Sequence, residues 1–415
     1  MNPLRQREQQ VLAEGREWTR RRLEEQLQED CLAMETVCPR SGEELEEVRW
    51  RDLQLETVSG TLHLKVRHGY SEELQSWICP ARQLWGLPAY GRMSPELEAR
   101  IAYTATEVGS YERAATMAKT WGSPVSDGCI HQHIQRLGTQ AQGLKLPTAL
   151  TPPGEPEFSL VIMMDGWMAR ERGVDWGAGP RRKNPQRIQW HEIKSAVIYR
   201  LEQRAQSSTG RGLLLEKYIV ATPPETSPLE FGARVQEEAM RRGLGRAKVV
   251  YLVMDGAVWL WDLGHDRFAE ATKTLDFHHA REHLQAIADA LHGAGTESAG
   301  AWLKPLLHSL RHGQEARVVR TLEELLLAVP PGRSMKDQAD LEREVNYFQT
   351  HRDHLHYQKM EEAGAPLGSG AVESLGKQLQ ARLRGCGQFW ARVGFTNLLR
   401  VCVLTKNKDD AYLWN

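Results

Sequence analysis

Continuous apolar runs dominate the middle of the chain and predict buried strands. One run begins at Phe158 and ends at the dipeptide Asp165-Gly166. Strands are also expected over 189–201 and 212–222, and another leads from residue 247 to a second Asp-Gly pair at 255–256. Helical spacing appears over 227–244, and 272–291 predicts a short strand that passes into a helix. The order of these elements favours a mixed sheet covered by helices.

Alternation of apolar and polar residues near the N-terminus predicts a hairpin that turns at Ser59-Gly60, after a charged helix over residues 1–30. Cys38 and Cys79 flank the hairpin, as the cysteines of a zinc ribbon would. The third residue after each is Ser41 and Arg82, so two of the four thiols are missing. We therefore expect a degenerate ribbon-like hairpin without structural zinc.

Three short helices are predicted over 94–137, because Ser94, Ser110 and Ser126 each stand where a helix cap is expected. This rhythm is typical of a helix-turn-helix whose last helix lies in a major groove. The groove-facing side chains would be His131, Gln132, His133 and Gln135. A small helical bundle with polar outer positions is an equally open interpretation.

The whole pattern predicts an α/β protein with a ribonuclease-H-like mixed sheet. Its expected regions are a helix and hairpin (1–90), the helical unit (94–145), a first core part (155–290), an all-helical insertion (291–362) and a last helix with a basic tail (363–415). A proline-rich linker is expected over 146–158. Histidines 351, 354 and 356 in the insertion are expected to be packing or surface residues rather than metal ligands.

The overall composition does not indicate a function, but the distribution of charge along the chain does. The chain has 415 residues and a formal net charge of -1, so a basic surface must be confined to one part. The segment from Gly376 to Asn415 contains seven lysines and arginines but only two acidic residues. No signal-peptide core or long apolar stretch is present, and the six cysteines are scattered. We expect a soluble intracellular protein with reduced thiols and no membrane partner.

Carboxylates at strand ends are the first chemical candidates. Asp165 and Asp255 each follow an apolar strand, where ligands gather in open sheets. Asp-Gly is also a common turn, which is the plainer explanation. A haloacid-dehalogenase-type phosphatase would need a second aspartate two residues later, but those positions are Trp167 and Ala257.

Glu373 is the third candidate, because it stands just after the corner Gly368-Ser369-Gly370. Ser369 is expected to cap a helix whose residues 373, 377, 380 and 384 form one polar stripe. An acid followed by basic side chains suits a metal ion and a phosphate backbone. A solvated helix with Glu-Lys pairing would show the same spacing.

Four segments together resemble a known family: "MMDGW", "VMDGAVWLW", "LDFHHAREHL" and "PLGSGAVESLGKQLQARLRGCGQFW". They are similar to the DDE transposases of bacterial insertion sequences, in particular the ISKra type, related to the Mutator-like superfamily, over about residues 38–400. The resemblance implies that Asp165, Asp255 and Glu373 are the catalytic triad. It also matches Asp276 and His279 to an acid-x-x-His motif. The chain departs from the family in its missing CxxC partners and in Gly387-Gln388-Phe389-Trp390, where relatives tend to have Gly-Met-Arg-Trp.

The implied chemistry is metal-dependent cleavage and joining of DNA. Two Mg2+ or Mn2+ ions roughly 3.5 to 4 Å apart activate the attacking oxygen and stabilise the leaving one. Asp165 and Asp255 would bridge the ions, Glu373 would hold the second, and His279 would orient the phosphate. Expected phosphate contacts are Lys194, Lys377, Arg382 and Arg384.

DNA is therefore the expected partner, bound by a homodimer or larger assembly in the bacterial cytoplasm at the nucleoid. Two other functions stay open. One is a transposase-derived DNA-binding protein with decayed end recognition, and the other is a hydrolytic nuclease of the same fold.

Overall fold

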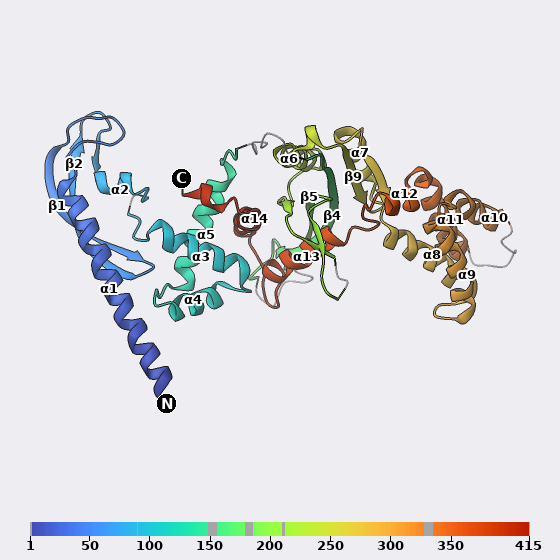
Figure 1. Cartoon of the computed structure of the whole chain (residues 1–415), viewed down its shortest axis with the longest axis horizontal. Helices are drawn as coiled ribbons and strands as arrows, with labels where there is room; N and C mark the ends of the chain where they lie inside the picture. The colour runs from blue at the N-terminus through green and yellow to red at the C-terminus, as the bar shows by residue number, and fades with distance from the viewer. Residues whose placement is uncertain are drawn as a thin grey trace. The chain divides into compact units, whose positions relative to one another are not determined.

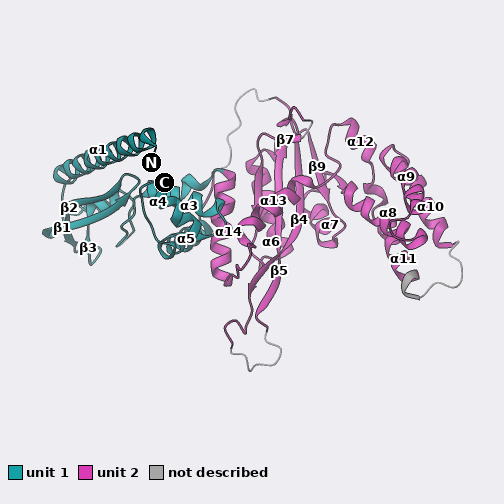
Figure 2. Ribbon diagram, turned by 90° about the horizontal axis from the view of Figure 1, so that it is seen from below, with its two compact units in different colours: residues 1–144, 408–415 teal, residues 145–407 magenta. Residues whose placement is uncertain are grey.

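A computed structural model describes residues 2–88, 90–147, 156–178, 186–209, 212–327 and 335–414, with the backbone alone at 335–337. The chain forms two compact units (Figure 2), residues 1–144 with 408–415 and residues 145–407. The predicted linker lies largely outside the described residues, as do residues 179–185 between two of the predicted strands. Predicted regions 1–90 and 94–145, apart from Lys145, fall in the first unit. Region 363–415 is divided between the units at Lys408.

The first unit begins with the predicted helix and hairpin. Its elements are α1 (Pro3–Ala33), β1 (Glu46–Thr57), β2 (Gly60–Ser71), β3 (Ser76–Ile78) and α2 (Pro80–Leu84). The turn pairs Thr57 with Gly60, as expected, and α1 packs on β2 over a leucine-rich core. Cys38 and Cys79 are both buried but belong to different apolar clusters. The described residues thus show a hairpin flanked by two buried thiols.

The helical part of the first unit has the three predicted helices, α3 (Pro95–Glu107), α4 (Tyr111–Thr120) and α5 (Asp127–Gln142). The hydroxyls of Ser94, Ser110 and Ser126 accept backbone N–H bonds at the helix starts, as their positions predict. The last turn of the chain, η3 (Asp410–Leu413), packs against this part, because Gln140 donates to the Leu413 carbonyl at 2.6 Å.

The second unit is built on a mixed five-stranded sheet with the order β10-β9-β4-β5-β8. Figure 1 labels β4, β5 and β9 of this sheet. The strands are β4 (Ser159–Arg172), β5 (Ile188–Arg200), β8 (Tyr218–Ala221), β9 (Val249–Met254) and β10 (Thr272–Leu275). β5 runs antiparallel to its neighbours β4 and β8, whereas β9 is parallel to β4 and β10 is parallel to β9. This mixed α/β arrangement is consistent with the predicted ribonuclease-H-like fold.

Helices cover both faces of the sheet. α6 (Pro228–Arg241), α7 (Val258–Arg267) and α8 (Phe277–His292) share one core with Leu160, Ile162 and Met164 of β4. The insertion continues this core through α9 (Glu297–Arg311), α10 (Glu315–Leu327), α11 (Met335–Thr350) and α12 (Tyr357–Glu362). α13 (Gly370–Leu383) and α14 (Arg392–Asn407) pack against β4, β5 and β8. No helix in the described ranges has the length and apolarity needed to cross a membrane.

Two strand predictions were wrong in detail. β4 does not end at Asp165-Gly166 but continues to Arg172, because β5 keeps pairing with it as far as Ile188. The expected strand 212–222 is divided into β7 (Gly212–Leu214), which pairs with β6 (Arg204–Gln206), and β8. The polar pair Glu216-Lys217 lies at the division.

Candidate acidic site

Asp165 of β4 and Asp255, which directly follows β9, lie at the same end of two neighbouring parallel strands. The last paired residues of β4 and β9 are Met164 and Met254, and each aspartate is the next residue in its chain. Paired residues of adjacent strands point to the same face. Backbone N–H groups fix both carboxylates, since Gly166 donates to Asp165 Oδ1 at 2.7 Å and Ala257 donates to Asp255 Oδ1 at 2.8 Å. The Asp-Gly pair of β4 is therefore a strand position rather than a turn.

Glu373 reaches the same region from the first turn of α13. This helix packs on β4 and β5, where Gly376 lies close to the indole of Trp167. The Trp167 ring is itself held by a 2.9 Å hydrogen bond to Ser195 Oγ. Ser369 stands at the predicted N-cap position, but its hydroxyl does not cap the helix. It donates to Glu373 Oε1 at 3.2 Å and so orients the carboxylate.

The charges of these groups act on one another. Burial raises the pKa of Asp165 to about 6, and the negative charges of Asp255 and Glu373 add to the rise. The Gly166 N–H and the charge of His279 act in the opposite direction. Asp255, Glu373 and His279 are thus near enough to Asp165 for their charges to change its pKa. The repulsion among the three carboxylates is the situation that a bound cation would relieve.

Oxygen donors of this kind fit a hard divalent cation such as Mg2+ or Mn2+. Among the described residues, however, no three histidine, cysteine, aspartate or glutamate side chains are grouped as ligands of one metal ion. The strand register brings Asp165 and Asp255 close, and the charges of Asp255 and Glu373 affect the pKa of Asp165. That the three carboxylates bind one or two cations is an expectation from their chemistry.

Asp276 has a structural position behind the site. It is fully buried, and its Oδ1 accepts backbone N–H bonds from His278 at 2.6 Å and from His279 at 3.3 Å, which caps α8. Its Oδ2 accepts from the Ser369 N–H at 2.6 Å. One carboxylate therefore fixes the start of α8, which carries His279, and the start of α13, which carries Glu373.

Removing this carboxylate with Asp276→Ala is expected to lower the free energy of unfolding by about 3 kcal/mol, because three backbone donors lose their acceptor. Chemical denaturation measures the change. Asp276→Asn should be intermediate, since its amide keeps one acceptor oxygen, and Asp262→Ala at an exposed position of α7 serves as the control. A loss below about 0.5 kcal/mol for Asp276→Ala would refute this role.

Tyr347 of α11, in the helical insertion, packs against Gly256 of the second Asp-Gly pair. A Cβ at Gly256 would stand 2.1 Å from Tyr347 Cε2, so only glycine fits there. Burial raises the pKa of Tyr347, and the nearby charge of Asp255 raises it further. The Tyr347 ring stacks on His283 at 3.6 Å, and its buried hydroxyl has no hydrogen-bond partner among the described residues. Nothing in the local sequence of α11 predicts this contact.

The histidines of the insertion pack, as expected. The rings of His351 and His354 lie 4.8 and 4.2 Å from Trp261, whose indole donates to the Asp255 carbonyl at 2.7 Å. Burial lowers the pKa of both histidines to about 4, so they are neutral near pH 7. His356 Nε2 lies 3.0 Å from Thr274 Oγ1.

The four predicted phosphate contacts of the second unit divide into two pairs. Lys377 and Arg384 are exposed on the polar stripe of α13, and the Lys377 ammonium lies 4.0 Å from the Glu373 carboxylate. Lys194 is only 8 % exposed and donates to the Thr226 carbonyl at 3.3 Å, while Arg382 is 3 % exposed and lies over the Trp390 ring. The second pair has structural contacts instead of a surface position.

On α5 of the first unit, His131 and Gln132 are exposed and Gln135 is half-buried. His133 does not face outward. Together with Arg136 and Trp414 it bonds the buried carboxylate of Glu98. Burial raises the pKa of Glu98, but these three hydrogen bonds outweigh it and leave the pKa below its usual value.

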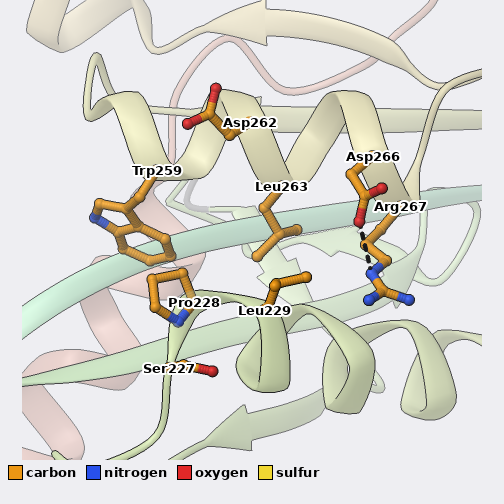
Figure 3. Close-up of a pocket in the computed structure, with 8 residues that line it drawn as sticks. All are labelled: Ser227, Pro228, Leu229, Trp259, Asp262, Leu263, Asp266 and Arg267. Atoms are coloured by element: carbon orange, nitrogen blue, oxygen red, sulfur yellow. Dashed lines mark ion pairs between the residues drawn. The ribbon is translucent and has the colours of Figure 1, made fainter.

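A separate cavity of about 400 Å³ lies between α6 and α7 (Figure 3). Trp259, Leu263, Pro228 and Leu229 give it apolar walls, and Asp266 pairs with Arg267 at one end. None of the three site carboxylates lines it. The ammonium of Lys194 lies 5.7 Å from the centre of the Trp259 ring.

No protein-family model and no curated protein sequence matches the chain. Among solved structures it is similar to the Drosophila P element transposase strand transfer complex, with a TM-score of 0.38 and 11 % sequence identity. The similarity covers 77 % of this chain and 94 % of that one. Similarity of this degree does not establish a family.

Proposed function

We propose that this chain is a DDE transposase that cleaves and joins DNA at the ends of a bacterial insertion sequence of the ISKra type. The observation that carries the proposal is the register of β4 and β9, which sets Asp165 beside Asp255. The effect of Glu373 and His279 on the pKa of Asp165 supports their place in the same site.

The residues of the chain would divide the work. Asp165 and Asp255 would be ligands of both divalent cations. Glu373, oriented by Ser369, would be a ligand of the second cation. When bound, Mg2+ or Mn2+ would activate the attacking oxygen and stabilise the leaving one. His279 would orient the phosphate. No covalent bond between DNA and a side chain is needed, because water or a DNA 3' hydroxyl is the nucleophile.

Basic and polar side chains would hold the DNA. Lys377 in α13 and Arg384 at its C-terminal end are exposed, and we expect them to contact phosphates. His131 and Gln132 are the exposed candidates for base contacts on α5. Synapsis of two element ends would require a homodimer or larger assembly.

An excision assay tests the proposal. A plasmid carrying candidate terminal repeats is offered to the full chain and to Glu373→Gln, with Glu324→Gln at an exposed position of α10 as the matched control. We expect excision to fall about 100-fold in Glu373→Gln, because a metal ligand is worth several kcal/mol of barrier. Excision by this variant at the wild-type rate would refute the triad.

The same assay separates the other two functions. Cleavage without joining would indicate a hydrolytic nuclease. Specific binding of the repeats without cleavage by the wild type would indicate a DNA-binding derivative.

A further inference from the structure

β4 and β5 extend beyond the acidic site and form an arm, defined here as residues 167–178 and 186–193 (Figure 2). Large apolar side chains are exposed along it. Trp190 is 47 % exposed and Trp176 is 43 % exposed, and Met168 and Ile188 are exposed to a similar degree. Single exposed apolar residues are ordinary, but a cluster on one projection indicates a binding surface.

Arginines alternate with the aromatic rings of this arm. The guanidinium of Arg384 lies 4.8 Å from the centre of the Trp190 ring, and that of Arg172 lies 5.3 Å from the centre of the Trp176 ring. Arg170 lies 5.1 Å from the ring of Phe389, which itself packs 5.0 Å from Trp176. These contacts hold the rings and the cations in one continuous surface.

The surface has uncompensated positive charge. Arg170 donates to the carbonyls of residues 384 and 385, Arg172 to that of Phe389, and Arg384 to the amide oxygen of Gln380. Within the described ranges none of these three guanidinium groups pairs with a carboxylate.

The acidic side chains of the arm have partners other than Arg170, Arg172 and Arg384. Glu171 is buried and pairs with Arg392 at 2.5 Å. Asp175 is buried and accepts the Gln186 N–H at 2.9 Å, and Glu192 pairs with Lys194 at 3.7 Å. The arm therefore offers an anionic ligand both positive charge and flat apolar rings.

We propose that the β4–β5 arm binds unpaired bases of a DNA strand next to the acidic site, with Trp190 and Trp176 as stacking surfaces and Arg170, Arg172 and Arg384 at the phosphates. Bases inside a duplex hide their faces, so a stacking surface of this kind selects unstacked nucleotides. Arg170 is paired with Trp190 and lies five residues after Asp165 on the same strand, about 17 Å away at the usual rise of a strand and, by the alternation of side chains, on its opposite face. This inference rests on the proposed function for the identity of the strand.

Binding by the full chain tests it without cleavage, in EDTA. Fluorescence anisotropy measures the dissociation constants of labelled oligo-dT and of a blunt duplex of the same length. Trp190→Ala should weaken oligo-dT binding about tenfold, since stacking of one base contributes on that scale, and should change duplex binding less than about twofold. Trp190→Phe should keep most of the affinity, and Trp18→Ala, an exposed tryptophan of α1, should have no effect.

Three results would overturn the inference: unchanged oligo-dT binding in Trp190→Ala, an equal loss on the duplex, or tighter binding of oligo-U than of oligo-dT. Thermal unfolding at the wild-type midpoint shows that the variant is folded, and if Trp190→Ala fails to fold, Trp176→Ala is measured instead. Because binding needs no metal, failure here leaves the excision test of Glu373→Gln standing. Conversely, if the wild-type chain binds the repeats but does not excise them, the proposed function fails while the binding of unpaired strands by the arm can still be measured.

Discussion

Asp165→Asn should abolish DNA cleavage and at the same time stabilise the folded chain. Cleavage should fall about 1,000-fold, because an aspartate between two cations contributes several kcal/mol to the transition state. The stabilisation has a separate origin. The carboxylate is partly buried beside Asp255 and Glu373, so its charge at pH 7 costs free energy that an uncharged amide does not.

The direction of the pH dependence follows from the pKa of Asp165. Folding raises it from 3.8 to about 6, so the folded chain binds more protons than the unfolded chain between these values. The stability that protonation provides is complete below about pH 4 and is lost as the pH rises through 6. Asp165→Asn should therefore be more stable than wild type at pH 7, by about 1 to 2 kcal/mol after discounting for partial exposure, and equally stable at pH 4.

Chemical denaturation at the two pH values, combined with a cleavage assay, checks both halves of this prediction. Asp262→Asn on the exposed side of α7 should change neither quantity. If Asp165→Asn cleaved DNA normally, the residue would not be a metal ligand. If it were less stable than wild type at pH 7, the repulsion inferred from the fold would be absent.

Gly256→Ala is expected to lower the free energy of unfolding by about 3 kcal/mol, although it adds only one methyl group. Its Cβ would overlap the ring of Tyr347 at 2.1 to 2.7 Å, and α11 holds that ring against His283. At Gly166 a Cβ would meet only the carboxylate end of Glu192, which can move, so Gly166→Ala should cost much less.

A double-mutant cycle isolates the contact. Gly256→Ala combined with Tyr347→Ala should be more stable than the sum of the two single losses predicts, because the overlap disappears with the ring. Gly300→Ala in α9, where a Cβ meets nothing within 4 Å, is the control. Strictly additive losses would show that Tyr347 is not the obstacle.

Features set by neighbouring residues could be predicted from the sequence. The serine caps of α3, α4 and α5 depend on a hydroxyl within three residues of a helix start, and the hairpin turn depends on Ser59-Gly60. The apolar runs of β4 and β9 likewise identify buried strands. Their pairing order then places the two aspartates together, so the candidate site follows from topology.

Features set by distant residues could not be predicted. Lys194 and Arg382 carry charged side chains, which are usually exposed. In this fold both are buried, and contacts with the Thr226 carbonyl and the Trp390 ring compensate for the cost of burying the charge. β4 passes through Asp165 because β5 continues beside it, which the sequence around Gly166 does not show. Trp259, Trp261 and Trp390 stand close to the candidate acids in the sequence but have packing contacts, whereas Trp176 and Trp190 on the arm are exposed.

Asp276 has one more consequence, for how this chain can vary. Its carboxylate touches residue 278 on one side and residue 369 on the other, so the chain leaves and rejoins the sheet at nearly the same point. Everything between those positions is a closed excursion, and its length does not set where Glu373 lies. Related chains could lengthen or shorten α9 and α10 freely, as long as a tyrosine still reaches Gly256. The insertion can thus diverge while the acidic site stays fixed.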